Sequence, residues 1–134
     1  MLKFTNLMIP TSDHDAALSF YRDALGLTVA SDFGNDAGRW VNLTSADQPE
    51  LQVTLGSVAA GPGVSDADRA ALAELLAKGH LGFYLFTTDD LDGLFARLVE
   101  TGADIVQEPA QQQWGPKDMA VRDPSGNLLR IAQG

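Results

Sequence analysis

The chain has 134 residues, 45% of them hydrophobic, which is enough for one core and too few for two ordinary independent domains. Nine Lys and Arg residues stand against 18 Asp and Glu, and the formal charge of −9 repels the phosphates of nucleic acids and anionic lipids. The absence of cysteine excludes disulfides, thiolate nucleophiles and thiolate metal sites. We therefore expect one domain, residues 1–134, that binds neither nucleic acid nor membrane.

The N-terminal residues predict a strand followed by a helix. Residues 3–9 are rich in branched and apolar side chains, and the strand should end at Pro10, which has no N–H to donate. The helix should begin at the N-cap Ser12 and stop at Gly26. The N-terminus lacks a basic stretch followed by an apolar core, and no apolar run approaches the roughly 20 residues that span a bilayer. We expect a cytoplasmic protein.

Three short strand-like runs come next, in residues 27–33, 38–43 and 50–55. In the last run apolar and polar residues alternate, which predicts a sheet with one apolar and one polar face. Residues 58–79 then form a Gly/Pro-rich linker and a connecting helix, for which Ser65 is the expected N-cap.

The order of elements then repeats. The run HLGFYLFT predicts a strand, Thr88 is the candidate N-cap of a helix, and three further strand-like runs follow. Sliding the chain by 76 residues superposes Thr11 on Thr87, Asp13 on Asp89, Leu18 on Leu94 and Gly26 on Gly102. Two βαβββ modules, residues 1–57 and 80–134, are the simplest account of this repeat.

Three segments carry a family resemblance: ALSFYRDALGL (17–27), TTDDLDGLFARLVETGADIVQEP (87–109) and WGPKDMAVRDPSGNLLRI (114–131). They resemble the vicinal oxygen chelate superfamily, which contains glyoxalase I, extradiol dioxygenases, fosfomycin-modifying enzymes and bleomycin-resistance proteins. The resemblance implies an α+β fold whose two tandem modules form a cup-shaped mixed sheet. Core packing and turn geometry also explain these motifs, so the function must be argued from the site.

In metal-using members of this superfamily, each module supplies one ligand from its first strand and one from its last. The resemblance places these positions at Asn6 and Thr54 in the first module and at Phe83 and Arg130 in the second. The 76-residue repeat independently pairs Thr54 with Arg130. None of the four suits a divalent ion, and the guanidinium of Arg130 has no acceptor atom. We expect no cofactor, and a divalent metal only with another ligand set.

His80 is the only weak metal candidate. A strand register shifted by one residue would put it on the same face as Tyr84, at the rim of the cup, where carboxylates such as Glu50 could join it. A capping, hydrogen-bonded or rim role is the simpler explanation for a single histidine. His14 lies in the first turn of a helix, and we expect it at the surface.

Aromatic and polar side chains give the predicted cup the character of a small-molecule pocket. The candidate lining residues are Asn6, Trp40, Gln52, Thr54, Phe83, Trp114, Met119 and Arg130, with Phe33 as a further wall. Core packing or a dimer interface explains each aromatic residue equally well. Arg39 and Arg122 are weaker candidates, because surface ion pairs explain them. No pair of nucleophile and base is identified.

Three functions remain open. The first is a metal-independent protein of the bleomycin-resistance type that binds or sequesters an aromatic or anionic compound, with Arg130 favouring an anionic or carbonyl-bearing ligand. The second is a metal-dependent enzyme, either a glyoxalase-type lyase or an extradiol-type dioxygenase. The third is a non-catalytic dimerisation module whose cup is filled by its own side chains. The resemblance also implies a homodimer, with modules paired within one chain or between two.

Overall fold

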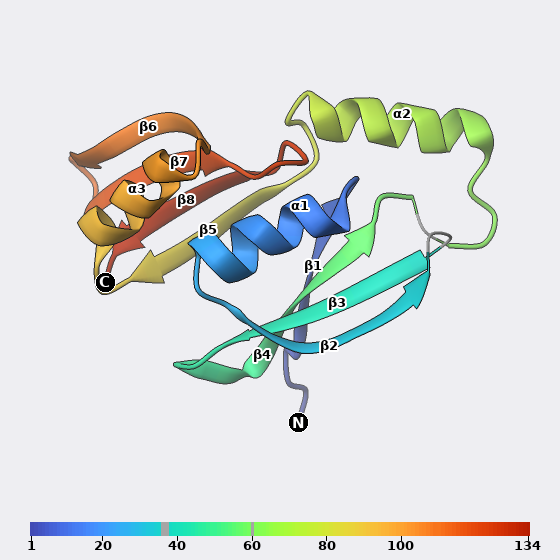
Figure 1. Ribbon diagram of the computed structural model, residues 1–134, viewed down its shortest axis with the longest axis horizontal. Helices are drawn as coiled ribbons and strands as arrows, with labels where there is room; N and C mark the ends of the chain where they lie inside the picture. Colours follow the sequence, from blue (N-terminus) through green and yellow to red (C-terminus); the bar gives the residue numbers. More distant parts are fainter. Residues whose placement is uncertain (36–37, 60) are drawn as a thin grey trace.

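The computed structural model describes residues 1–35, 38–59 and 61–134, and it contains two four-stranded mixed sheets (Figure 1). The first, sheet A, belongs to the first half of the chain. Its strands lie in the order β1 (Asn6–Thr11), β4 (Gln48–Ser57), β3 (Gly38–Ser45) and β2 (Thr28–Asn35). β1 is parallel to β4, whereas β3 is antiparallel to both of its neighbours.

The second sheet, sheet B, repeats this topology. Its strands lie in the order β5 (Phe83–Thr88), β8 (Leu128–Gln133), β7 (Lys117–Arg122) and β6 (Asp104–Gln111). β5 is parallel to β8, and the other two pairs are antiparallel. The predicted α+β fold of two tandem βαβββ modules is confirmed. In the part of the chain that the structure describes, the sheets stay separate and do not close into a barrel.

Helical segments of both modules lie between the two sheets (Figure 1). They are α1 (His14–Leu18), which continues as the π-helical segment η1 (Ser19–Ala24), and α3 (Leu91–Glu100). A further helix, α2 (Asp66–Ala77), lies in the connection between the modules. Side chains of α1, η1, α3 and one face of each sheet form a single core cluster, so the two modules share one hydrophobic interior.

Aspartates cap the helices in both modules. Asp13 caps α1 and Asp90 caps α3, and each accepts a hydrogen bond at 3.0 Å from the backbone N–H three residues later. The predicted caps Ser12 and Thr88 are therefore wrong. In each case an aspartate lies one or two positions further on, and a carboxylate also interacts favourably with the positive end of the helix dipole.

Other local signals are confirmed, with one exception. Ser65 caps α2, its hydroxyl accepting from the backbone N–H of Asp68 at 3.1 Å. Gly26 and Gly102 have φ angles of 82° and 76°, the left-handed conformation that ends a helix. Strand β1, however, begins later than predicted and continues through Pro10, which is tolerated because β1 is an edge strand.

A buried hydrogen bond joins the two modules at one end of the core. The Tyr21 hydroxyl, on η1, donates to Asp123 Oδ2 at 2.6 Å. Asp123 begins the DPSGN turn between β7 and β8, and its Oδ1 accepts from the backbone N–H groups of residues 125–127, each at 2.9 Å. Burial, together with the neighbouring Asp123 carboxylate, raises the pKa of Tyr21 well above its ordinary value.

The same turn also fastens the end of β1. The hydroxyls of Thr11 and Ser125 are 2.9 Å apart, and Asn127 Nδ2 donates to the carbonyl of Pro10 at 2.9 Å. Thr11, Ser125 and Asn127 are all at most 5% exposed. We call this set, with Tyr21 and Asp123, the junction. Most of its polar groups are buried and paired, with Asn127 Oδ1 as the exception among the described residues, and the junction therefore fixes the relative position of the modules.

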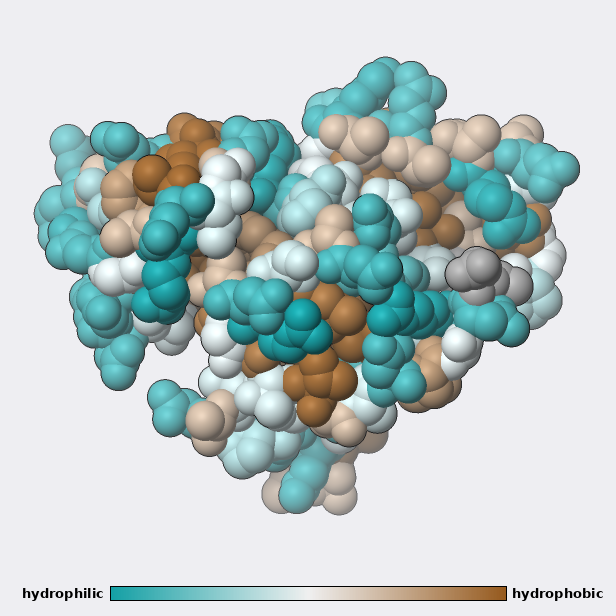
Figure 2. Space-filling model, in the orientation of Figure 1, coloured by the Kyte–Doolittle hydropathy of each residue, from teal (hydrophilic) through white to brown (hydrophobic). Residues whose placement is uncertain are grey.

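The surface is largely hydrophilic on the side shown in Figure 2, with smaller apolar patches. None of the helices among the described residues is both long and apolar enough to cross a membrane. The large exposed hydrophobic side chains include several strand residues on the sheet faces that do not pack on the core, among them Met8, Phe33, Phe83 and Leu85.

Candidate functional site

Each sheet buries one face in the shared core and exposes part of the other, because side chains alternate along a strand. In sheet A, Leu55 belongs to the core, so its neighbour Thr54 lies on the opposite face. In sheet B, Ile131 belongs to the core, so Arg130 lies on the opposite face. We call these two surfaces the open faces. Leu85, which pairs with Arg130, has an exposed fraction of 72%.

A polar network crosses the open face of sheet A. The Thr54 hydroxyl donates to Asn42 Oδ1 at 2.6 Å, and Asn42 Nδ2 donates to the Ser31 hydroxyl at 2.8 Å. From β1, Asn6 Nδ2 donates to the Thr54 hydroxyl oxygen at 3.1 Å and to Gln52 Oε1 at 3.3 Å. The network links all four strands with uncharged groups, and it contains three predicted site residues, Asn6, Gln52 and Thr54.

The open face of sheet B carries a charged cluster instead. Arg130 Nε donates to Asp118 Oδ2 at 3.0 Å, and Arg130 Nη2 donates to Gln107 Oε1 at 2.7 Å. Gln112 Nε2 also donates to Asp118, at 2.7 Å. The hydrogen bond from Arg130, assisted by the one from Gln112, holds the pKa of Asp118 below its ordinary value despite burial. The guanidinium therefore faces a carboxylate that neutralises it.

The four positions implied by the family resemblance occupy equivalent places in the two modules: Asn6 corresponds to Phe83, and Thr54 corresponds to Arg130. Asn6 lies two residues before the partner of Thr54 in the parallel pair, and Phe83 lies two residues before the partner of Arg130. Asn6 and Thr54 bond to each other, Phe83 is apolar, and Arg130 is cationic and already bound to Asp118. These side chains do not fit a divalent ion.

No group of three or more His, Cys, Asp or Glu side chains that could hold a metal ion occurs within residues 1–35, 38–59 and 61–134. His80 is exposed in the loop between α2 and β5, and its backbone N–H bonds to the carbonyl of Leu75. The shifted register is wrong, because Tyr84 packs against the core and Phe83 occupies the open face. Glu50 is exposed at the start of β4.

The aromatic candidates divide between the sheet faces. Phe33 and Trp40 are paired on β2 and β3 and lie on the open face of sheet A, whereas Phe83 lies on that of sheet B. Trp114 is 78% exposed in the turn between β6 and β7. Met119 is 0% exposed and belongs to the core. Its prediction as a pocket residue is wrong, since it pairs with the core residue Ile131 and so shares its face.

A groove of about 940 Å³ lies between the modules, at the opposite end from the junction (Figure 2). Its floor is apolar and includes Leu7, Val53 and Leu94, and its rim includes Asp118 and Arg130. The groove runs beside the edge of sheet B. It reaches the charged cluster on that sheet, but its lining does not include Asn6, Thr54, Trp40 or Phe83. The two open faces therefore do not enclose this cavity together.

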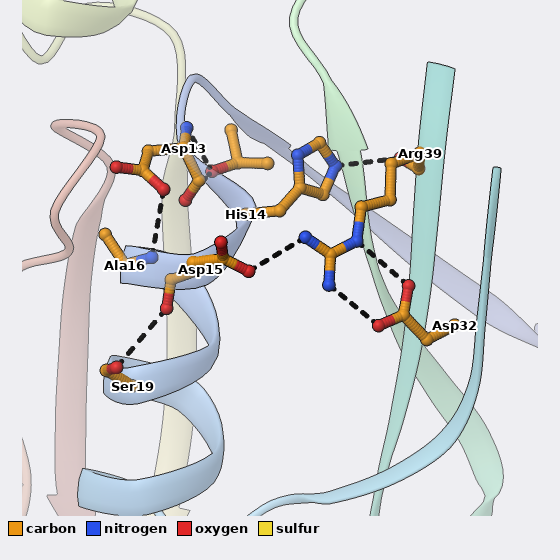
Figure 3. A network of polar contacts seen from close by, with 8 residues as sticks. Asp13, His14, Asp15, Ala16, Ser19, Asp32 and Arg39 are labelled. Carbon is orange, nitrogen blue, oxygen red and sulfur yellow. Dashed lines mark hydrogen bonds and ion pairs between the residues drawn. The ribbon is translucent and has the colours of Figure 1, made fainter. Parts of the chain in front are cut away.

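Arg39 fixes the outer hairpin of sheet A to helix α1 (Figure 3). Its guanidinium donates to both oxygens of Asp32, at 3.0 and 2.8 Å, and to Asp15 at 2.9 Å. His14 Nε2 lies 2.8 Å from the carbonyl oxygen of Arg39. Hydrogen bonding by Arg39 lowers the pKa of Asp32. Arg39 points away from the open face, and its bonds join β2 and β3 to α1.

Sequence reasoning missed the partners of the predicted site residues. Asn42 and Ser31 complete the network on sheet A, and Asp118 and Gln107 complete the cluster on sheet B. One signal could have found all four, since the 76-residue shift that pairs Thr54 with Arg130 also superposes Ser31 on Gln107 and Asn42 on Asp118.

Two tandem βαβββ modules, each with a polar centre on an open sheet face, define the class of this protein. A profile of the Glyoxalase/Bleomycin resistance protein/Dioxygenase superfamily matches residues 3–131, and the chain belongs to that superfamily.

Known proteins resemble nearly the whole chain. The uncharacterized protein YurT of Bacillus subtilis (strain 168) is 28% identical over 133 residues, which cover 98% of this chain and 99% of YurT. The crystal structure of UcmS2 has a TM-score of 0.85 and 30% identity, covering 100% of this chain and 99% of UcmS2. TnmS3, an antibiotic binding protein from Streptomyces sp. CB03234, has a TM-score of 0.70 and 25% identity, covering 98% and 95% of the two chains.

Proposed function

We propose that this protein binds a small organic molecule on its open sheet faces without a metal ion, as proteins of the bleomycin-resistance type do. The chemistry at the four family positions carries the proposal. An amide, a hydroxyl, a phenyl ring and a paired guanidinium stand where a metal site needs anionic or imidazole donors. The same mixture of apolar surface and a few polar groups suits an organic ligand.

The nature of the charged cluster favours a neutral, carbonyl-bearing ligand over a strongly anionic one. Arg130 is matched by Asp118, so the cluster adds no net positive charge to an acidic protein. Asp118 and Gln107 engage Nε and Nη2 of the guanidinium, and no bond from Nη1 occurs within the described residues, so Nη1 can donate to a ligand. The likeness to TnmS3 supports a ligand of the antibiotic kind.

We also propose that a second copy of the chain completes the pocket. Phe33 and Met8 on sheet A have exposed fractions of 56% and 47%, and Phe83 and Leu85 on sheet B have 56% and 72%. Apolar exposure of this kind on a sheet marks an interaction surface. In this arrangement the open face of sheet A from one copy lies opposite that of sheet B from the other, and a ligand binds between them.

Equilibrium dialysis of chelator-treated protein against a panel of antibiotics and aromatic metabolites tests this function. We expect micromolar binding of at least one compound, no gain on adding Mn, Fe, Ni or Zn, and at least tenfold weaker binding by Arg130→Met. Arg22→Met is the matched control, because the Arg22 side chain is exposed and, among the described residues, bonds to its neighbour Asp23 alone.

Metal analysis and sedimentation complete the test. Near-stoichiometric metal in protein purified without chelator, or binding that appears only with an added ion, would contradict metal independence. A monomer that binds ligand with full affinity would contradict the composite pocket. Failure of every compound in the panel would leave the dimerisation module as the better account.

A further inference from the structure

Gly56 leaves the open face of sheet A without a side chain near the end of β4. It is buried in β4, paired with Pro10 of β1 on one side and with Trp40 of β3 on the other. A Cβ atom at this position would lie 2.7 Å from Met8 Sδ and 2.8 Å from Trp40 Cζ3, closer than real Cβ atoms approach other atoms. The side chains of Trp40 and Met8 therefore lean over β4 from either side and occupy the space that any other residue would need.

Because position 56 carries no side chain, the apolar surface at this point is shallow. The benzo ring of Trp40, through Cε3 and Cζ3, lies over a strand that carries no side chain at this point. The thioether of Met8 lies beside the same position. Phe33 pairs with Trp40 on the same face and exposes 56% of its surface. We call Met8, Phe33, Trp40 and Gly56 the platform.

The platform and the row beside it carry no charge. The adjacent row holds Ser31, Asn42 and Thr54, whose side chains are hydrogen-bonded to one another. The net charge of −9 disfavours an anionic ligand here, and the area itself supplies no carboxylate to pair with a cationic one, so it suits an uncharged ligand. Apolar aromatic surface beside neutral donors and acceptors matches a molecule with a flat hydrophobic body and oxygen atoms along one edge.

We infer that the ligand is a flat, uncharged, fused-ring aromatic compound with carbonyl or hydroxyl groups on one edge, and that Gly56 is the residue that selects for flatness. This inference rests on the proposed function and narrows its ligand class. A methyl group at position 56 displaces the indole ring or Met8, and the surface on which a flat molecule stacks is lost. The Arg39 network holds the hairpin that carries Phe33 and Trp40 in place beneath the ligand.

The two tryptophans of the chain allow a direct test. In a Trp114→Phe background, Trp40 is the only tryptophan, so quenching of its fluorescence reports binding at the platform. The flat probe is riboflavin, an uncharged three-ring compound with carbonyl groups on one edge, and the non-flat probe is hydrocortisone, followed by equilibrium dialysis. We expect riboflavin to quench Trp40 and to bind at least tenfold more tightly than hydrocortisone.

The test variant is Gly56→Ala, and its matched control is Gly38→Ala on β3, where an added Cβ meets nothing within 4 Å. We expect Gly56→Ala to weaken riboflavin binding at least tenfold and Gly38→Ala to leave it within twofold. Trp40→Leu, measured by dialysis, removes the indole while keeping an apolar side chain. It should show the same loss even if Gly56→Ala unfolds, which circular dichroism would reveal.

Three outcomes would overturn the inference. One is equal binding of the flat and non-flat probes. Another is a folded Gly56→Ala variant, or a Trp40→Leu variant, that binds riboflavin as the parent does. The third is a panel ligand whose affinity neither variant changes, which would leave the proposed function standing without the platform. If no compound of either shape binds, the proposed function fails together with the inference.

Discussion

The junction and the open faces use polar side chains in opposite ways. At the junction, Tyr21, Asp123 and Asn127 are at most 5% exposed, and Asp123 alone accepts five hydrogen bonds. On the open faces, the central polar side chains Thr54 and Asp118 are also no more than 8% exposed, but they lie next to large apolar side chains that are about half exposed or more. The first arrangement holds two modules in one geometry, and the second leaves an accessible surface with a defined hydrogen-bonding pattern.

The difference between the junction and the open faces predicts which substitutions affect the free energy of unfolding and which affect ligand binding. A buried donor that loses its acceptor costs a large part of its desolvation free energy, whereas a surface group can turn to water instead. Substitutions at the junction should therefore reduce the free energy of unfolding strongly. Substitutions on the open faces should reduce it less and change ligand binding more.

Asp123→Ala should have the largest effect on stability. The change leaves buried donors of Tyr21, Asn127 and the turn backbone without an acceptor, and we expect a loss of about 3 kcal/mol or more in the free energy of unfolding. Urea titration followed by circular dichroism measures it. Asp47→Ala is the matched control, because the 76-residue shift superposes Asp47 on Asp123 and Asp47 is exposed. A loss at Asp47 as large as that at Asp123 would contradict the comparison.

Tyr21→Phe should have the second-largest effect and lower the free energy of unfolding by about 1.5–3 kcal/mol, because it removes one hydrogen bond to a buried carboxylate. Tyr84→Phe provides the comparison. Its hydroxyl donates to the carbonyl of Met8 at 3.2 Å, and we expect a loss of about 1 kcal/mol or less. Equal losses in the two variants would show that the charge of Asp123 adds nothing to the junction.

Arg130→Met should cost about 1–2 kcal/mol, because it leaves the carboxylate of Asp118 without its cation. The double variant Arg130→Met with Asp118→Leu should recover part of that loss. A double-mutant cycle in urea gives the coupling free energy directly. Additive losses would mean that the two side chains do not interact in solution.

The cluster also predicts a pH dependence of stability. The pKa of Asp118 is lower in the folded protein than its ordinary value, so its contribution is fully present above the unfolded pKa, near pH 4, and is lost as the pH falls below it. Wild-type protein and Arg130→Met should therefore converge in stability between about pH 4 and pH 2. Thermal unfolding over this range measures the difference, and a constant offset down to pH 2 would refute the prediction.

Arg39→Ala should have the smallest effect on stability, below about 1 kcal/mol, because its ion pairs with Asp15 and Asp32 are largely exposed. Its effect on riboflavin binding should be larger than that change implies, since the hairpin that carries Trp40 loses its tether. Affinity and unfolding free energy are measured on the same preparation. Arg22→Ala, which changes an exposed arginine, should alter neither quantity.

The two modules could be predicted from the sequence because the residues that begin and end their helices and strands act locally. Gly26 and Gly102 end helices through backbone geometry, and the repeat pairs them without any knowledge of the fold. The N-caps could not be predicted, because each helix start offers two suitable residues within one turn. These are Ser12 and Asp13 for the first helix, and Thr88 and Asp90 for the other. Only the path of the incoming chain decides between them.

The site was predictable only in part, for a geometric reason. The repeat placed Arg130 on the same type of face as Thr54, but the alternation in DMAVRD does not reveal which half of its residues faces the core. Met119 was therefore assigned to the wrong face. Asp118 pairs with Ala132, diagonally to Arg130, and this register depends on the length of the DPSGN turn rather than on any property of Asp118.

The wide turn of η1 makes the junction dependent on the number of residues in the first helix. In η1, the N–H of Leu25 bonds to the carbonyl of Phe20, five residues earlier, so this segment accommodates one residue more than a regular α-helix would. Removing Ser19 or Phe20 would shift Tyr21 by one position, which is about 100° around the helix axis. Tyr21 would then lose its alignment with Asp123, and the junction would lose its hydrogen bond between helix and turn.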